Sequence, residues 1–90
     1  MTKAELVNAI AVQSGLDKTT VLTVVEGVMA NIKNSLAGGE PVFLRGFGSF
    51  INKKRAEKLA RNISTHTSII VPEHRVPYFK PAKEFVAQVR

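Results

Sequence analysis

Residues 53–61 read KKRAEKLAR and lead directly into Asn62-Ile63. Five of these nine residues are basic and one is acidic. Alternation along the segment leaves neither face apolar enough to be core, and residues 68–71 (SIIV) form a return run with strong β preference. The pattern therefore predicts a two-stranded ribbon over residues 52–75 with its tip near residues 62–67. Such a ribbon is marginally stable in water by itself, so the remainder of the chain is expected to be its platform.

The length and residue types limit how this platform can be stabilised. Ninety residues fit one domain with a small core. The chain has no cysteine and two histidines, so disulfides are excluded and neither a metal nor a cofactor is expected. Association with a second chain is the remaining source of stability.

The charge is unevenly distributed along the chain. The formal net charge is +6, with −1 in residues 1–44 and +7 in residues 45–90. No apolar run approaches the ~20 residues that cross a bilayer, and the N-terminus lacks a signal-peptide pattern. We therefore expect a soluble, intracellular chain whose second half carries the positive charge.

Two helices are predicted in the first half of the chain. Residues 2–5 (TKAE) have the capping-box pattern, and Gly15 is placed to end the first helix. Asp17 is a second candidate N-cap, and the helix after it should end at Gly38-Gly39. Its apolar stripe consists of Val21, Val25, Val28, Ile32 and Leu36, extended by Leu22, Val24 and Met29. This surface is too wide for one short helix to cover, which leaves two interpretations: the sheet covers the remainder, or a second copy does, and the second is favoured.

The segments around the ribbon are predicted to be a short sheet and a last helix. Residues 41–44 read as a strand, and residues 45–50 (RGFGSF) as a turn into the next one. The two glycines of the turn permit positive φ, Phe47 and Phe50 can anchor it, and Arg45 with the free N–H groups of the turn could contact phosphate. Pro81 is placed to open a helix over residues 81–90. Lys80 and Lys83 at its entrance either serve an external anion or add solubility.

The basic run admits two interpretations. A charge run is often a solvated surface. The high density of basic residues on a projecting ribbon with few acidic residues favours the second interpretation, an arm that binds along phosphates and releases counterions. The apolar Ile63 near the tip could in addition enter a base step as a wedge. An enzyme is not expected, because Asp17 is assigned to a cap and neither His66 nor His74 has a nearby acid pair.

Four segments of the chain carry a resemblance to a known family. They are residues 45–50 (RGFGSF), 55–57 (RAE), 61–62 (RN) and 76–84 (VPYFKPAKE). Over all 90 residues the chain resembles the HU/IHF family of bacterial DNA-bending proteins. The resemblance implies an α+β fold in which a helical hairpin (1–40) serves dimerisation, a three-stranded antiparallel sheet (41–80) carries the arm (52–75), and a short helix (81–90) ends the chain. It further implies an intertwined dimer whose arms enter the DNA minor groove.

The arm tip departs from the family pattern. Ile63 stands where the family usually has proline, and His66 where it has a turn glycine. Isoleucine keeps the size and polarity of a wedge but is less rigid and retains its N–H group.

The resemblance, together with the charge pattern, implies the following sites. The DNA-binding residues are Lys3, Arg45, Gly46, Lys53, Arg55, Lys58, Arg61, Asn62, Ile63 as wedge, Arg75, Lys80 and Lys83. The dimer core consists of Val25, Val28, Met29, Ile32, Leu44, Phe47, Phe50 and Phe79.

These sites imply an architectural protein that bends double-stranded DNA with low sequence specificity, in the nucleoid of the cytoplasm. The partners are then DNA and a second chain, identical or related, with no membrane. The alternative is a basic module that binds structured RNA or another polyanionic partner without bending DNA.

Overall fold

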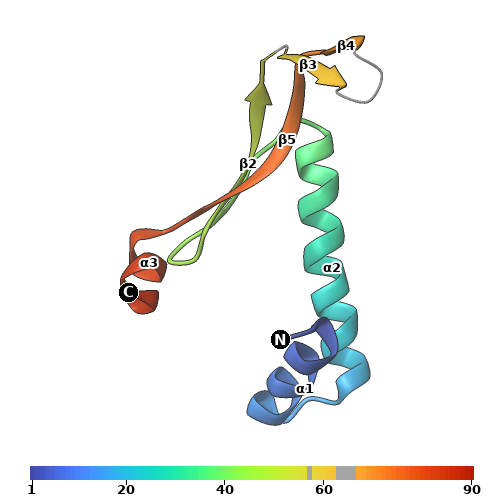
Figure 1. The fold of residues 1–90 in the computed structure, drawn as a ribbon. Coiled ribbons are helices and arrows are strands. Elements are labelled where there is room, and N and C mark those ends of the chain that lie inside the picture. Colours follow the sequence, from blue (N-terminus) through green and yellow to red (C-terminus); the bar gives the residue numbers. More distant parts are fainter. Residues whose placement is uncertain (57, 63–66) are drawn as a thin grey trace. The chain divides into compact units, whose positions relative to one another are not determined.

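The computed structural model of the chain describes residues 1–56, 58–62 and 67–90. Its elements, in chain order (Figure 1), are α1 (Lys3–Ser14), α2 (Lys18–Ala37), β1 (Val42–Leu44), β2 (Gly48–Arg55), β3 (Lys58–Asn62), β4 (Thr67–Val71), β5 (His74–Pro81) and α3 (Lys83–Val89). They belong to two compact units, Met1–Ser35 and Leu36–Arg90. The predicted α+β class, with two N-terminal helices and a three-stranded antiparallel sheet, is confirmed. None of the described helices has the length and apolarity needed to cross a membrane.

Capping residues define the ends of both long helices as predicted. The Thr2 hydroxyl oxygen accepts from the Glu5 N–H at 3.2 Å, and Gly15 ends α1 in the left-handed region with φ of 76°. The Asp17 carboxylate accepts from the Thr20 N–H at 3.2 Å at the start of α2. A hydrogen bond from the Thr20 hydroxyl, together with this backbone bond, lowers the pKa of Asp17.

The core of a single chain is small. The buried hydrophobic side chains among the described residues are Val7, Ala11, Val21 and Leu36, and none of the large ones is fully buried. Val7, Ala11 and Val21 form one cluster in the first unit. Apolar side chains on α2 remain exposed, including Val24 at 59% and Val28 at 49%. One copy of the chain therefore leaves much of its apolar surface in water.

The sheet of the second unit has the order β1-β2-β5, and every pairing in it is antiparallel. Its edge strand β5 contains Pro77 and Pro81, which an edge tolerates because one side of the strand needs no ladder donors. In the β1–β2 turn Gly46 has φ of 80°, as the sequence indicated. Gly48 does not have a positive φ. A Cβ at Gly48 would lie 2.6 Å from the Lys80 carbonyl oxygen, so glycine is required there by close strand approach and not by a positive φ.

Four phenylalanines pack together beside this turn. The ring centroids of Phe50 and Phe79 are 4.9 Å apart, those of Phe47 and Phe79 5.1 Å, and those of Phe47 and Phe85 5.3 Å. Phe85 belongs to α3, which begins at Lys83 with Ala82 as its N-cap. The predicted start at Pro81 is wrong, because Pro81 still pairs with Gly48 as the last residue of β5.

The predicted ribbon consists of two paired segments instead of one. Pairing of β2 with β5 ends at Arg55↔His74, and pairing of β3 with β4 resumes at Lys58↔Val71. The register is the same on both sides of the interruption, because two residues separate Arg55 from Lys58 and two separate Val71 from His74. Pro72 lies in the gap and has no N–H group to donate to a ladder. Figure 1 shows β3 and β4 beyond the ends of β2 and β5. The predicted wedge Ile63 and turn residue His66 lie outside the described residues.

Candidate nucleic-acid interface

The register of the β2–β5 pair sorts its side chains into two faces. Residues paired across an antiparallel ladder share a face, and successive residues alternate. The basic face consists of Ser49, Ile51, Lys53, Arg55, His74, Val76, Tyr78 and Lys80. The aromatic face consists of Gly48, Phe50, Asn52, Lys54, Arg75, Pro77, Phe79 and Pro81. Three of the predicted DNA-binding cations therefore share one face with no carboxylate among its eight residues.

A cation–π contact lies on the basic face. The Lys53 Nζ is 4.7 Å from the centroid of the Tyr78 ring, and Tyr78 is 43% exposed. The two residues are diagonal neighbours, because Lys53 pairs with Val76 and Tyr78 with Ile51. The contact gives Lys53 a preferred position while its ammonium group stays accessible. Sequence reasoning missed Tyr78, since the diagonal relation requires the strand register.

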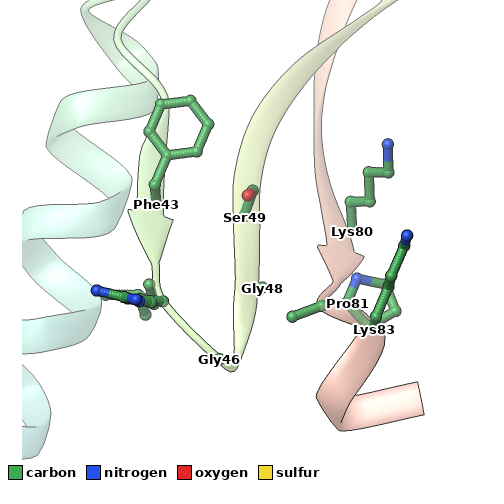
Figure 2. A pocket seen from close by; sticks show the side chains of 10 residues that line it. Phe43, Gly46, Gly48, Ser49, Lys80, Pro81 and Lys83 are labelled. Atoms are coloured by element: carbon green, nitrogen blue, oxygen red, sulfur yellow. The ribbon is translucent and has the colours of Figure 1, made fainter. Parts of the chain in front are cut away.

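A second group of cations surrounds a pocket between the β1–β2 turn and the β5–α3 junction. This pocket of about 350 Å³ is lined by Phe43, Leu44, Arg45, Gly46, Gly48, Ser49, Lys80, Pro81, Ala82 and Lys83. Figure 2 shows Lys80 and Lys83 extending from the β5–α3 junction on one side, with Phe43 on β1 across from them and Gly46 at the turn. Arg45, Lys80 and Lys83 are all exposed, so the structure brings these three predicted contacts together at one open pocket.

The N–H groups of the turn are less available than the sequence suggested. The Phe47 N–H donates to the Leu44 carbonyl oxygen at 3.0 Å, and the Ala82 N–H donates to the Phe47 carbonyl oxygen at 2.9 Å. The prediction of a free N–H group is therefore wrong for Phe47, because that group closes the turn. The exposed side-chain cations of this pocket are Arg45, Lys80 and Lys83.

Lys3 lies in the first unit, where its Nζ forms an ion pair with the Glu26 carboxylate at 2.5 Å. Both side chains are about half exposed. A phosphate that contacts Lys3 would compete with this carboxylate.

Arg75 and Lys54 lie on the aromatic face, opposite each other in the register. Lys54 pairs with Glu73 across the ribbon at 2.9 Å. Arg75 was predicted to contact DNA, but its guanidinium lies near Gly39, where a Cβ would be 3.3 Å from Nη1. The other predicted arm residues Lys58, Arg61 and Asn62 belong to β3.

Comparison with known proteins agrees with this geometry. The family model described as bacterial DNA-binding protein matches residues 1–90. The DNA-binding protein HU of Staphylococcus aureus is 43% identical over 83 residues, which are 92% of each protein, and HU of Thermotoga maritima is 38% identical over the full 90 residues of both. This chain belongs to the HU family of bacterial DNA-binding proteins. The resemblance inferred from its sequence motifs is thus confirmed.

Solved structures of HU proteins share the fold of this HU-family chain. An Anabaena HU–DNA cocrystal structure is similar with a TM-score of 0.94 at 34% identity, covering 99% of this chain and 97% of that one. HU from Thermotoga maritima is similar with a TM-score of 0.71 at 28% identity over the whole of both chains.

The predicted dimer core of this HU-family chain is incompletely covered in one copy. Val28, Met29, Leu44 and Phe47 are exposed, at 49%, 36%, 37% and 46%. Val25, Ile32, Phe50 and Phe79 are partly buried. A further apolar pocket of about 320 Å³ is lined by Phe79, Pro81, Phe85, Val86, Val89 and Arg90. None of the eight predicted dimer-core residues is fully buried in one copy, although Val25 packs against the cluster of the first unit.

Proposed function

We propose that this chain is an architectural protein that binds and bends double-stranded DNA with low sequence specificity. The observation that carries the proposal is the basic face, on which Lys53, Arg55 and Lys80 lie without a carboxylate. When such a surface binds phosphates, counterions are released from the DNA, and this favours binding whatever the base sequence. Similarity to an Anabaena HU–DNA cocrystal structure supports DNA as the polyanion, and HU-family membership supports a binding function over a catalytic one.

Two surfaces would cooperate in the complex. The pocket cations Arg45, Lys80 and Lys83 contact phosphates near the sheet, while Lys58, Arg61 and Asn62 follow the minor groove along the arm. Ile63 enters a base step and kinks the duplex. The minor groove presents a degenerate pattern, so discrimination is limited largely to A·T against G·C, and flexible or bent DNA is preferred because it costs less to deform.

The active form is a dimer of two identical or closely related chains. Its support is the apolar surface that one copy leaves exposed, on α2 at Val24 and Val28 and at the pocket between β5 and α3. Burial of this surface adds the stability that a 90-residue chain without disulfides lacks. Two arms on one dimer can hold both sides of a bend. We place this dimer in the nucleoid of the cytoplasm, where the DNA that it binds is located.

Salt titration of duplex binding tests the proposal. Lys53→Ala removes a cation from the basic face and should reduce the slope of log K against log salt by about 0.9. Lys54→Ala is the matched control, since Lys54 lies on the aromatic face and pairs with Glu73. Equal slopes for the two variants would contradict the assignment of the faces, and a wild-type preference for an RNA duplex over DNA of equal length would contradict DNA as ligand.

Bending is tested separately with fluorophores at the ends of a DNA duplex. Ile63→Ala should relax the bend while binding persists, whereas Arg61→Ala should weaken binding. An unchanged end-to-end distance with Ile63→Ala would exclude the wedge.

A further inference from the structure

The aromatic face meets the end of α2 at the base of the ribbon. The Asn52 Nδ2 donates to the Leu36 carbonyl oxygen at 2.8 Å, in a partly buried position. The same oxygen accepts from the Gly39 N–H at 3.0 Å. Carbonyl groups in the last turn of a helix lack intrahelical donors, so Asn52 supplies a partner that α2 itself cannot. The bond joins β2 to the chain segment that ends α2.

Arg75 approaches the same segment from β5. Its register partner is Lys54, and two cations opposite each other on one face repel. The two side chains have different neighbours, because Lys54 pairs with Glu73 while the Arg75 guanidinium lies near Gly39. A cation near the C-terminal end of a helix is stabilised by the exposed carbonyl groups there. Gly39 has φ of 85° and no Cβ, which leaves room for the guanidinium.

We propose that Asn52 and Arg75, together with Leu36 and Gly39, form a root contact that fixes the base of the ribbon to the end of α2. Arg75 is then a positioning residue for the arm and not a phosphate contact. Two observations separate it from the DNA-binding cations. It lies on the aromatic face, whereas Lys53, Arg55 and Lys80 lie on the basic face, and its guanidinium is directed to the Gly39 turn.

The root contact matters because the strand pairing of the ribbon is interrupted beyond it. Pairing is interrupted between Arg55↔His74 and Lys58↔Val71, so the outer segment receives its direction from the inner one. A fixed inner segment reduces the conformational freedom that the arm loses on binding. The effect on DNA binding rests on the proposed function, whereas the contact itself can be tested in the free protein.

Amide hydrogen exchange of the free protein tests the contact. Asn52→Leu removes the amide at similar volume, and Arg75→Gln removes the charge at similar reach. Each should speed exchange of the Gly39 amide about fivefold, the equivalent of one net hydrogen bond. The Gly15 amide, which donates to the Ala11 carbonyl oxygen at the end of α1, should keep its rate. Lys54→Gln is the control for loss of a cation from the same face and should leave both amides unchanged.

Salt titration with a DNA duplex then separates positioning from contact. Arg75→Gln should weaken binding several-fold at an unchanged salt slope, whereas Lys53→Gln should lower the slope by about 0.9. The proposal is overturned if Arg75→Gln lowers the slope as much as Lys53→Gln, or if the Gly39 exchange rate is unaffected by both root variants. Acceleration of the Gly15 amide to the same extent would also overturn it, since the variants would then act on global stability. Should the wild-type protein fail to bind duplex DNA, the proposed function falls, and the exchange rates alone still decide the root contact.

Discussion

Replacing Gly48 by alanine should destabilise the sheet strongly for a substitution of one methyl group. The added Cβ would lie 2.6 Å from the Lys80 carbonyl oxygen and 2.6 Å from two ring carbons of Phe79. The oxygen belongs to the backbone of the paired strand, and the Phe79 ring packs against Phe47 and Phe50. Neither neighbour can move without disturbing β5. Overpacking of this kind typically costs about 1–3 kcal/mol, and contact with backbone favours the upper end of that range.

Gly27→Ala provides the matched control. A Cβ at Gly27 meets no atom within 4 Å, and alanine inside a helix is favoured over glycine by up to about 1 kcal/mol. The free energies of unfolding of the two variants should therefore differ by about 3 kcal/mol, which is a large part of the ~5–15 kcal/mol stability of a typical domain. In a small domain a loss of about 2–3 kcal/mol lowers the melting temperature by roughly 10–20 °C.

Urea unfolding followed by circular dichroism measures this difference. All variants must be compared at one protein concentration, because association contributes to apparent stability. A Gly48→Ala variant that unfolds at the wild-type urea concentration would refute the close-approach reading of this glycine, as would equal midpoints for Gly48→Ala and Gly27→Ala.

Three further predictions concern the helices. Val28→Asp places a charge on the exposed apolar surface of α2 and should convert the dimer to single chains, as measured by analytical ultracentrifugation. Val12→Asp, at a position 77% exposed on α1, should leave the dimer intact. The pKa of Asp17 lies below its ordinary value of 3.8 in the folded chain, so its contribution to stability is present above that value and is lost as the pH falls through the lowered pKa. Asp17→Asn keeps a capping side chain but cannot ionise, so the melting temperature of this variant should fall less than that of the wild type as the pH is lowered. An equal fall in the two proteins would contradict the prediction. Glu26→Gln frees Lys3 from an exposed ion pair and should alter the free energy of unfolding by less than about 1 kcal/mol. A larger loss in denaturant titrations would show that this pair has a structural role.

Structural features that depend on interactions between residues close in the sequence could be predicted. Thr2, Gly15 and Asp17 define helix ends because a cap depends on groups one to four positions away. The family could also be predicted, because the basic residues and the glycine spacing of the chain match the pattern of that family. The basic run at residues 53–55 was correctly placed on a strand because its residues alternate and residues 68–71 have a strong β preference.

Signals that depend on a paired strand were not predictable. Gly48 looked like a turn glycine until β5 was placed beside it, and Arg75 looked like one more cation of a basic half until the register put it on the aromatic face. Tyr78 carried no signal in isolation, because its contact with Lys53 crosses strands. The start of α3 was misplaced at Pro81 because proline fits both an edge strand and a helix entrance.

Only four hydrophobic side chains are buried in one copy among the residues that the structure describes, and this small core affects how much of the protein is folded. Folding that is completed by encounter with another copy is second order, so the native fraction rises with the number of molecules made. Unpaired copies leave apolar side chains of α2 and of the β5–α3 pocket exposed, so we expect proteases to degrade them before paired copies. Cellular abundance and conformational stability are thereby tied to each other through the same apolar residues.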